Sequence, residues 1–325
     1  MTRPKKTYGY GGKRFSAPVH NRARVKRCKW CYPHIGMCAS YVIRSKGCTK
    51  KIVASDPIFL LKYKIEIFLY RQYKEDMALW SSGEFEALPF KEADVSLCTT
   101  GSMNMDKNRY GNILPPDSTR IILDNGKYIN ANMIDLDERG SQMIACQGPL
   151  DYTIEDFWSM ILQHHTNVIL MVTPLVEKGN VKCAKYWPEP RKISQYGRIK
   201  ILNLYSNQVS TSLIVSRLLI SSPLTKRLVY HIYYYGMPDF GAVKDLDEIY
   251  LVLCILISLS TSKLFVCHCS AGVGRTGVIA AILRCLRTEE PPIKAISVIR
   301  KQRHGMVQTK LQFRMIRSLV NQVSD

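Results

Sequence analysis

The first 55 residues of this 325-residue chain contain no aspartate and no glutamate, although they hold 14 of its 46 lysines and arginines. The remaining residues are close to balanced, with 32 basic side chains against all 26 acidic ones, so most of the formal charge of +20 lies in the first segment. Such a sharp change of composition predicts a boundary, and we interpret residues 1–55 as a basic, flexible N-terminal arm.

Long apolar runs are also missing. The longest, residues 249–259, is too short to span a bilayer, and the N-terminus lacks the apolar segment of a secretory signal. With 46% hydrophobic and 22% charged residues, the composition excludes disorder throughout. These features predict an intracellular protein, cytoplasmic or alternatively nuclear.

The arm has several interpretations. Its basic run, densest at residues 22–29, is typical of a solvated tail. The alternatives are a nuclear-localisation signal or nucleic-acid-binding patch, and a mitochondrial presequence. Four of the 11 cysteines also lie there, in the spacing C-x2-C-x6-C-x9-C: Cys28, Cys31, Cys38 and Cys48. Four thiolates could bind zinc, but the second pair is not closely spaced, so unpaired thiols are the alternative.

Residues 56–325 mix strand and helix patterns without strict alternation, which predicts one α/β domain around a mixed sheet. Short runs rich in β-formers predict strands at residues 167–173, 199–204, 213–219, 228–235 and 264–268. Amphipathic or capped segments predict helices at residues 57–72, 153–166, 245–259, 277–288, 291–302 and 311–320.

The segment CSAGVGRTG (residues 269–277) leads from the last predicted strand into a helix. The N–H groups of a glycine-rich loop at a helix N-terminus form an anion-binding cradle, here built from Ser270, Ala271, Gly272, Val273, Gly274 and Arg275. Cys269 lies at its mouth, where positive potential favours the thiolate. The planar guanidinium of Arg275 can bind two phosphate oxygens, and Thr276 can donate its hydroxyl to the leaving sulfur.

Two other interpretations of this segment are weaker. Gly272, Gly274 and Gly277 satisfy the G-x-G-x-x-G pattern of dinucleotide-binding loops, but that pattern leaves Cys269 and Arg275 unexplained. An ordinary tight turn with a buried cysteine leaves Arg275 unexplained as well.

The string HCSAGVGRTG (residues 268–277) resembles the H-C-x5-R-[ST]-G signature of protein tyrosine phosphatases. Further segments resemble the landmarks of that family in its order: KNRY (107–110), YINA (128–131), QGPL (147–150), DFW (156–158), EKG (177–179), KC (182–183), YWP (186–188), PDFG (238–241) and RKQR with MVQT (300–309). The resemblance covers residues 58–323. It implies a single phosphatase domain with a twisted mixed β-sheet flanked by helices, no cofactor and no catalytic-site metal.

The resemblance also implies residue roles. Cys269 resembles the nucleophile that forms a cysteinyl-phosphate, and Asp239 the general acid on a mobile loop. The other roles are phosphoryl binding (Arg275), loop orientation (His268), water positioning (Gln308, with Gln312 beside it), substrate contact (Tyr110, Asn112 and Gln312), support of Arg275 (Glu177) and contact with the acid loop (Lys182). By contrast, we interpret His231, in an apolar strand, as structural.

Two positions depart from the family pattern. Met237 stands where the acid loop usually has tryptophan, and Asn112 where aspartate usually binds the substrate backbone. The tryptophan normally anchors the hinge of the acid loop, so methionine at this position predicts less well-defined loop closure. The alternative to an active phosphatase is therefore a pseudophosphatase that binds phosphotyrosine with little turnover. The expected partners are phosphotyrosine proteins, with nucleic acid only through the arm, and the oligomeric state is not predicted. The divergent acid loop and short arm are similar to those of bracovirus phosphatases, which implies a role in host signalling or immunity.

Overall fold

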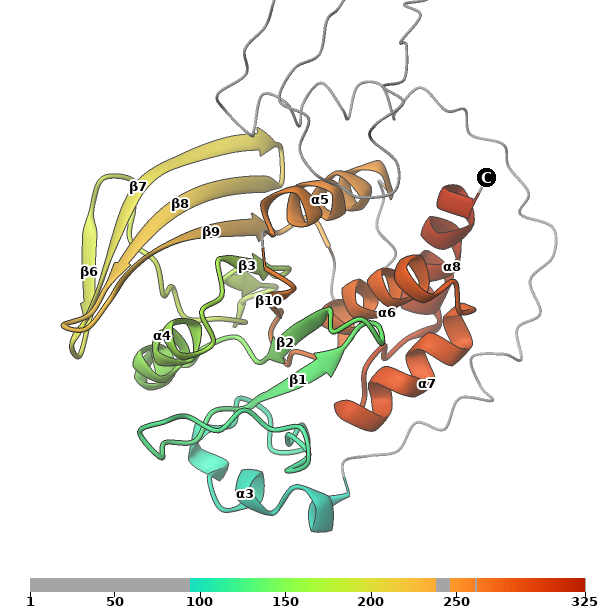
Figure 1. Ribbon diagram of the computed structural model, residues 1–325, viewed down its shortest axis with the longest axis horizontal. Helices are drawn as coiled ribbons and strands as arrows, with labels where there is room; N and C mark the ends of the chain where they lie inside the picture. The colour runs from blue at the N-terminus through green and yellow to red at the C-terminus, as the bar shows by residue number, and fades with distance from the viewer. Residues whose placement is uncertain (1–93, 238–245, 261, 325) are drawn as a thin grey trace, which may run out of the picture. The chain divides into compact units, whose positions relative to one another are not determined.

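The computed structural model describes residues 94–237, 246–260 and 262–324 (Figure 1). The basic arm, its four cysteines and the helix predicted at residues 57–72 lie outside the described residues. So does Asp239, together with the rest of the predicted acid loop after Met237.

Within the described residues, eight strands form one mixed sheet in the order β1-β2-β10-β3-β9-β8-β7-β6. Their bounds are β1 Ala131–Asp135, β2 Gln142–Cys146, β3 Val168–Met171, β6 Ile193–Tyr196, β7 Ile199–Ser210, β8 Leu213–Ser221, β9 Lys226–Tyr234 and β10 Leu264–His268. A separate small hairpin pairs β4 (Val176–Glu177) with β5 (Asn180–Val181). The mixed α/β fold predicted from the sequence is confirmed.

The middle of the sheet is parallel: β10 lies between β2 and β3, and β3 pairs with β9. β3 is buried along its whole length, and β10 everywhere except Leu264, which is why both strands are short continuous apolar runs rather than alternating ones. Because parallel neighbours end at the same edge of a sheet, the residues that follow β10 emerge beside the ends of β2 and β3.

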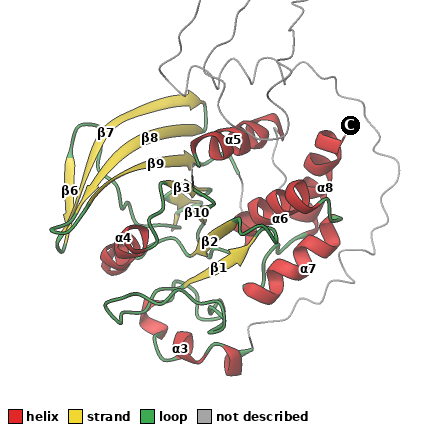
Figure 2. Ribbon diagram, in the orientation of Figure 1, coloured by secondary structure: helices red, strands yellow, loops and turns green. Residues whose placement is uncertain are grey.

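Helices cover both faces of the sheet (Figure 2). One face packs against α5 (Leu246–Leu259), α6 (Gly274–Thr288), α7 (Pro292–Gln302) and α8 (Lys310–Ser324), and the opposite face packs against α4 (Ile154–Gln163). Short helical turns η1 (Val95–Leu97), α3 (Thr99–Ser102), η2 (Met105–Lys107) and η3 (Asp151–Thr153) complete the assigned elements of the described chain. No helix in these ranges combines the length and apolar character needed to cross a membrane.

Most predicted elements differ from the observed ones in their bounds, and β1, β2 and β6 are strands that the sequence patterns did not predict. Two of the differences in bounds have an identifiable cause. α6 begins at Gly274, three residues early, because Gly277 N–H donates to Val273 C=O and extends the helix through glycines that propensity disfavours. β7 continues to Ser210 instead of ending at residue 204, since β-bulges near Asn203 and Gln208 break the alternation while the pairing with β8 continues.

The fully buried Leu170 at the centre of β3 provides a test of this core. Leu170→Ala should lower the free energy of unfolding by about 2–5 kcal/mol, because it leaves a cavity that the packed layers cannot close. Leu224→Ala, at a side chain that is 97% exposed, is the control and should change it by less than about 0.5 kcal/mol. Urea denaturation of both variants measures the difference, and equal losses would contradict the assigned core.

Candidate active site

The loop between β10 and α6 wraps around the sulfur of Cys269. Cys269 directly follows the last residue of β10, and the backbone N–H of Gly272 donates a hydrogen bond to its Sγ at 3.2 Å. α6 begins at Gly274, so the first N–H groups of a 15-residue helix open onto the same space. The loop therefore provides backbone donors around a buried sulfur.

Gly272 is required by its backbone and by its surroundings. Its φ is +73°, in the left-handed region, and a Cβ there would lie 2.1 Å from the carbonyl oxygen of Cys146 in β2. The loop thus packs directly against the backbone of the neighbouring strand.

Arg303 fixes the direction of the loop peptides. Its guanidinium, 1% exposed, donates to the carbonyl oxygens of Gly272 (2.9 Å) and Ala271 (3.1 Å) and to the side-chain oxygens of Asn130 and Asn132. Because a peptide unit is planar and trans, holding the Ala271 carbonyl on one side directs the Gly272 N–H to the other, toward Cys269. Sequence reasoning noted Arg303 only as a family landmark and missed this function.

Arg275 lies fully buried beside the sulfur loop. Its Nη1 is 3.1 Å from the carbonyl oxygen of Met237 and 3.4 Å from Oε2 of Glu177. The Glu177 contact is the one that the resemblance implied. Met237 is the first residue of the predicted acid loop. Arg275 is therefore hydrogen-bonded to the start of that loop.

A cavity of about 230 Å³ opens over the loop. It is lined by Tyr110, Asn112, Ile113, Lys182, Cys269, Ser270, Ala271, Gly274, Arg275 and Gln308. The structure thus brings together residues that lie up to 198 positions apart and that sequence reasoning had selected, and it adds Ile113. His268, Thr276, Glu177 and Gln312 support the cavity from behind its lining.

Tyr110 forms one wall of the cavity. The Ser270 hydroxyl donates to the carbonyl oxygen of Lys182, so the Tyr110 hydroxyl, 2.9 Å from Ser270 Oγ, is the donor in their shared bond. The preceding Arg109 donates to the carbonyl oxygens of Gly148 and Pro149 and holds this segment on the rest of the domain.

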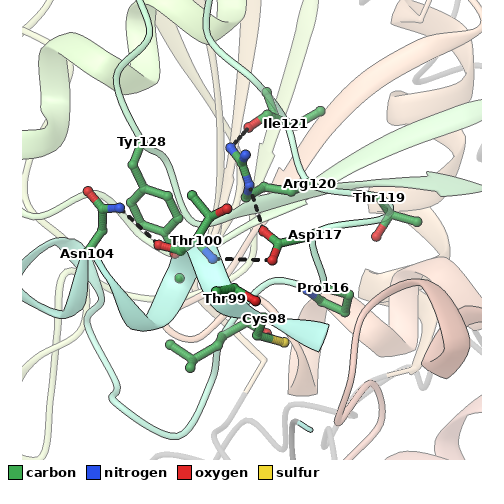
Figure 3. A network of polar contacts seen from close by, with 12 residues as sticks. Cys98, Thr99, Thr100, Asn104, Pro116, Asp117, Thr119, Arg120, Ile121 and Tyr128 are labelled. Atoms are coloured by element: carbon green, nitrogen blue, oxygen red, sulfur yellow. Dashed lines mark hydrogen bonds and ion pairs between the residues drawn. The ribbon is translucent and has the colours of Figure 1, made fainter. Parts of the chain in front are cut away.

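A polar network joins the α3 segment to Asp117 and Arg120 (Figure 3). Asp117 accepts from the backbone N–H of Thr100 and from the side chain of Arg120, and Asn104 donates to the carbonyl oxygen of Thr100. Desolvation raises the pKa of Asp117, but these hydrogen bonds outweigh it and the net pKa is lowered. The carboxylate therefore stays charged and bonded to the start of the described chain.

Gln308 and Gln312 are adjacent but differently placed. Gln312 is buried, and its Oε1 accepts from the Gln308 backbone N–H at 2.7 Å. A Cβ on Gly274 would lie 2.7 Å from Oε1 of Gln308, which shows how closely this side chain approaches the start of α6. Gln308 thus reaches the cavity, and Gln312 orients it.

Five buried cysteines of the described chain are held as neutral thiols. Burial raises the pKa of Cys98 to about 11 and those of Cys146 and Cys285 to about 12. Burial also raises the pKa of Cys183, and that of Cys267 well above its ordinary value, the latter opposed by the hydroxyl of Thr276. All seven cysteines in the described ranges are free of disulfides.

Comparison with known proteins identifies the family. Residues 104–322, about two thirds of the chain, match the protein-tyrosine phosphatase family. The chain belongs to that family. Human tyrosine-protein phosphatase non-receptor type 4 is 36% identical over 253 residues, which cover 72% of this chain and 27% of that protein. The Arabidopsis thaliana protein-tyrosine-phosphatase PTP1 is 36% identical over 238 residues, covering 67% and 70%. This chain therefore spans about a quarter of the human relative.

Solved structures give the same family. The catalytic domain of human protein tyrosine phosphatase non-receptor type 18 superposes with a TM-score of 0.69 at 28% identity, covering 82% of this chain and 99% of that one. A structure of PTPN18 in complex with HER2 phosphopeptides gives a TM-score of 0.70 at 31% identity, covering 75% and 99%.

Two buried histidines behind the loop should make stability depend on pH. Burial lowers the pKa of His231 to about 3 and that of His268 to about 4. The unfolded chain therefore binds more protons below about pH 6.5, and stability should fall as pH drops from 6.5 toward 4. His231→Gln should flatten the slope of unfolding free energy against pH in this window by up to about 1.4 kcal/mol per pH unit. Urea denaturation at several pH values measures it, and an unchanged slope would show that His231 is not buried as a neutral base.

Proposed function

We propose that this protein hydrolyses phosphotyrosine in proteins through a cysteinyl-phosphate intermediate. The observation that carries the proposal is the Cys269 sulfur, bonded to a backbone N–H, in a cavity lined by Arg275 and Gln308. Membership of the family supports it. The activity needs neither metal nor cofactor, because the nucleophile, anion donors and acid all come from the chain.

The first step forms the phosphoenzyme. The Cys269 thiolate attacks phosphorus, the bond from phosphorus to the tyrosyl oxygen breaks, and the leaving phenolate takes a proton from Asp239. Asp239 lies outside the described residues, and Met237, two positions before it, accepts a hydrogen bond from Arg275. Arg275 and the N–H groups of residues 270–275 bind the phosphoryl oxygens throughout.

The second step releases phosphate. Water attacks the cysteinyl-phosphate, Asp239 takes its proton, and the bond from phosphorus to sulfur breaks to regenerate the thiolate. We propose that this water binds to Gln308, which lines the cavity and whose backbone N–H donates to Gln312. His268 acts on the loop through its contact with the Cys269 carbonyl oxygen. For Thr276, whose hydroxyl interacts with Cys267, we propose donation to the leaving Cys269 sulfur.

Selectivity for tyrosine follows from the wall of the cavity. Tyr110 and Ile113 offer apolar surface to an aromatic ring above the sulfur, whereas a phosphoserine side chain is too short to reach it. We propose that Asn112, which lines the same cavity, binds the peptide around the phosphotyrosine, and that Lys182, also in the lining, contacts the acid loop. The PTPN18 complex with HER2 phosphopeptides supports proteins as the substrate class.

Finer aspects of function belong to this proposal. The match to non-receptor phosphatases supports a cytoplasmic site of action, and the resemblance to bracovirus phosphatases supports host signalling proteins as substrates. For the arm, residues 1–55, we propose solvent exposure or nucleic-acid binding. Salt-sensitive binding to RNA or DNA by the full chain, lost when residues 1–55 are deleted, tests the second role.

Turnover separates an enzyme from a trapping protein. Wild type should hydrolyse a phosphotyrosine peptide, and Cys269→Ser should lower kcat by at least about 10³-fold because a hydroxyl replaces the nucleophile. Phosphate release and peptide binding are measured on both proteins. Equal, background turnover with binding retained by both would favour the pseudophosphatase and overturn the catalytic proposal.

Loss of the acid should affect chemistry more than binding. Asp239→Ala should lower kcat by about 10²–10⁴-fold while Kd for a phosphotyrosine peptide changes little, because protonation of the phenolate occurs only in the transition state. An unchanged kcat would assign the acid to another residue. A pull-down with this variant would recover substrate proteins for identification.

A further inference from the structure

Three buried side chains form a hydrogen-bonded chain behind the catalytic loop. The Tyr186 hydroxyl lies 2.8 Å from Nε2 of His231 in β9 and 2.7 Å from Nε2 of His268 at the end of β10. All three are essentially inaccessible to solvent. The Tyr186 ring is held by Phe157, Trp158 and Trp187, with centroid distances of 4.7, 5.6 and 4.9 Å. The hydroxyl is thus fixed between two imidazoles.

The direction of these hydrogen bonds can be assigned from the loop outward. Nδ1 of His268 lies 3.1 Å from the carbonyl oxygen of Cys269, which can only accept, so the His268 proton is on Nδ1. Burial lowers the pKa of His268 to about 4, so the ring is neutral at pH 7 and its Nε2 carries a lone pair. That lone pair must accept the single proton of Tyr186.

His231 must then donate. Once Tyr186 gives its proton to His268, its oxygen can only accept, and the facing Nε2 of His231 carries the N–H. Nδ1 of His231 has no hydrogen-bond partner among the described residues, as expected for the nitrogen that bears a lone pair rather than a proton. The contact of His268 Nδ1 with the Cys269 carbonyl oxygen fixes this proton order, and the lack of an acceptor at Nδ1 of His231 agrees with it.

We propose that His231 is a positioning residue, which acts through Tyr186 to keep the His268 proton on the carbonyl oxygen of the nucleophile Cys269. This rests on the proposed function and deepens it. Without the His231 donor, the Tyr186 hydroxyl can turn toward Sδ of Met171, 3.8 Å away, and accept from Nε2–H of His268 instead. The Cys269 carbonyl then loses its donor, and the loop loses a constraint beside the sulfur.

A double-mutant cycle tests whether His231 acts through Tyr186. His231→Leu should lower kcat by about 3–10-fold with KM within about twofold, and His231→Gln, whose amide can donate, should recover most of the loss. In a Tyr186→Phe background, His231→Leu should cause no further loss. The control Val229→Ala, at a buried apolar side chain on the same strand, should lower Tm but leave kcat within about twofold. The same fold-loss from His231→Leu in both backgrounds would overturn the proposal.

NMR of protein labelled with ¹⁵N-histidine gives a test independent of turnover. At pH 7 the wild type should show Nδ1–H for His268 and Nε2–H for His231, assigned by the loss of one ring signal in His231→Gln. His231→Leu should shift part of the His268 population to Nε2–H. A His231 protonated on Nδ1, or an unchanged His268 tautomer in His231→Leu, would overturn the proposal. Absent turnover in the wild type would count against the phosphatase function alone, and the NMR result would still decide the role of His231.

Discussion

Arg303 binds the carbonyl oxygens of Ala271 and Gly272. Because the Ala271 carbonyl and the Gly272 N–H belong to one planar peptide, this N–H faces the Cys269 sulfur. The same guanidinium also donates to the side-chain oxygens of Asn130, just before β1, and Asn132, in β1. A buried cation is unfavourable unless its donors are satisfied, and here two of the four acceptors come from the loop around Cys269. Breaking the loop conformation would therefore leave part of a buried guanidinium without acceptors, which couples the loop geometry to stability.

The loop is held from several directions at once. The Cys146 backbone blocks any side chain at Gly272, and the His268 ring bonds the Cys269 carbonyl. None of these groups lines the cavity. The groups that line the cavity are thus positioned by groups that do not line it. Under the proposed function, the backbone donors then need little rearrangement when charge develops on the phosphoryl oxygens.

Much of this could be predicted from the sequence, for identifiable reasons. Both ends of β10 were predicted correctly, because its short run is bounded by loop signals. The pattern of residues 269–277 is specific enough to predict which residues form the floor of the cavity. The start of α6 was missed because the glycines demanded by phosphate approach are poor helix formers. The directions of the Arg303 and His231 bonds were not predictable, since each depends on partners brought from distant strands by the sheet order, which periodicity does not encode.

The elevated pKa values of the buried thiols have a consequence for chemical modification. Cys98, Cys146 and Cys285 remain protonated at neutral pH, and protonated thiols react slowly with electrophiles and peroxide. Their burial removes access as well. These three cysteines are therefore protected from covalent reagents in two ways, so an electrophile shaped for the cavity can discriminate Cys269 from them by access to the cavity rather than by an unusual warhead.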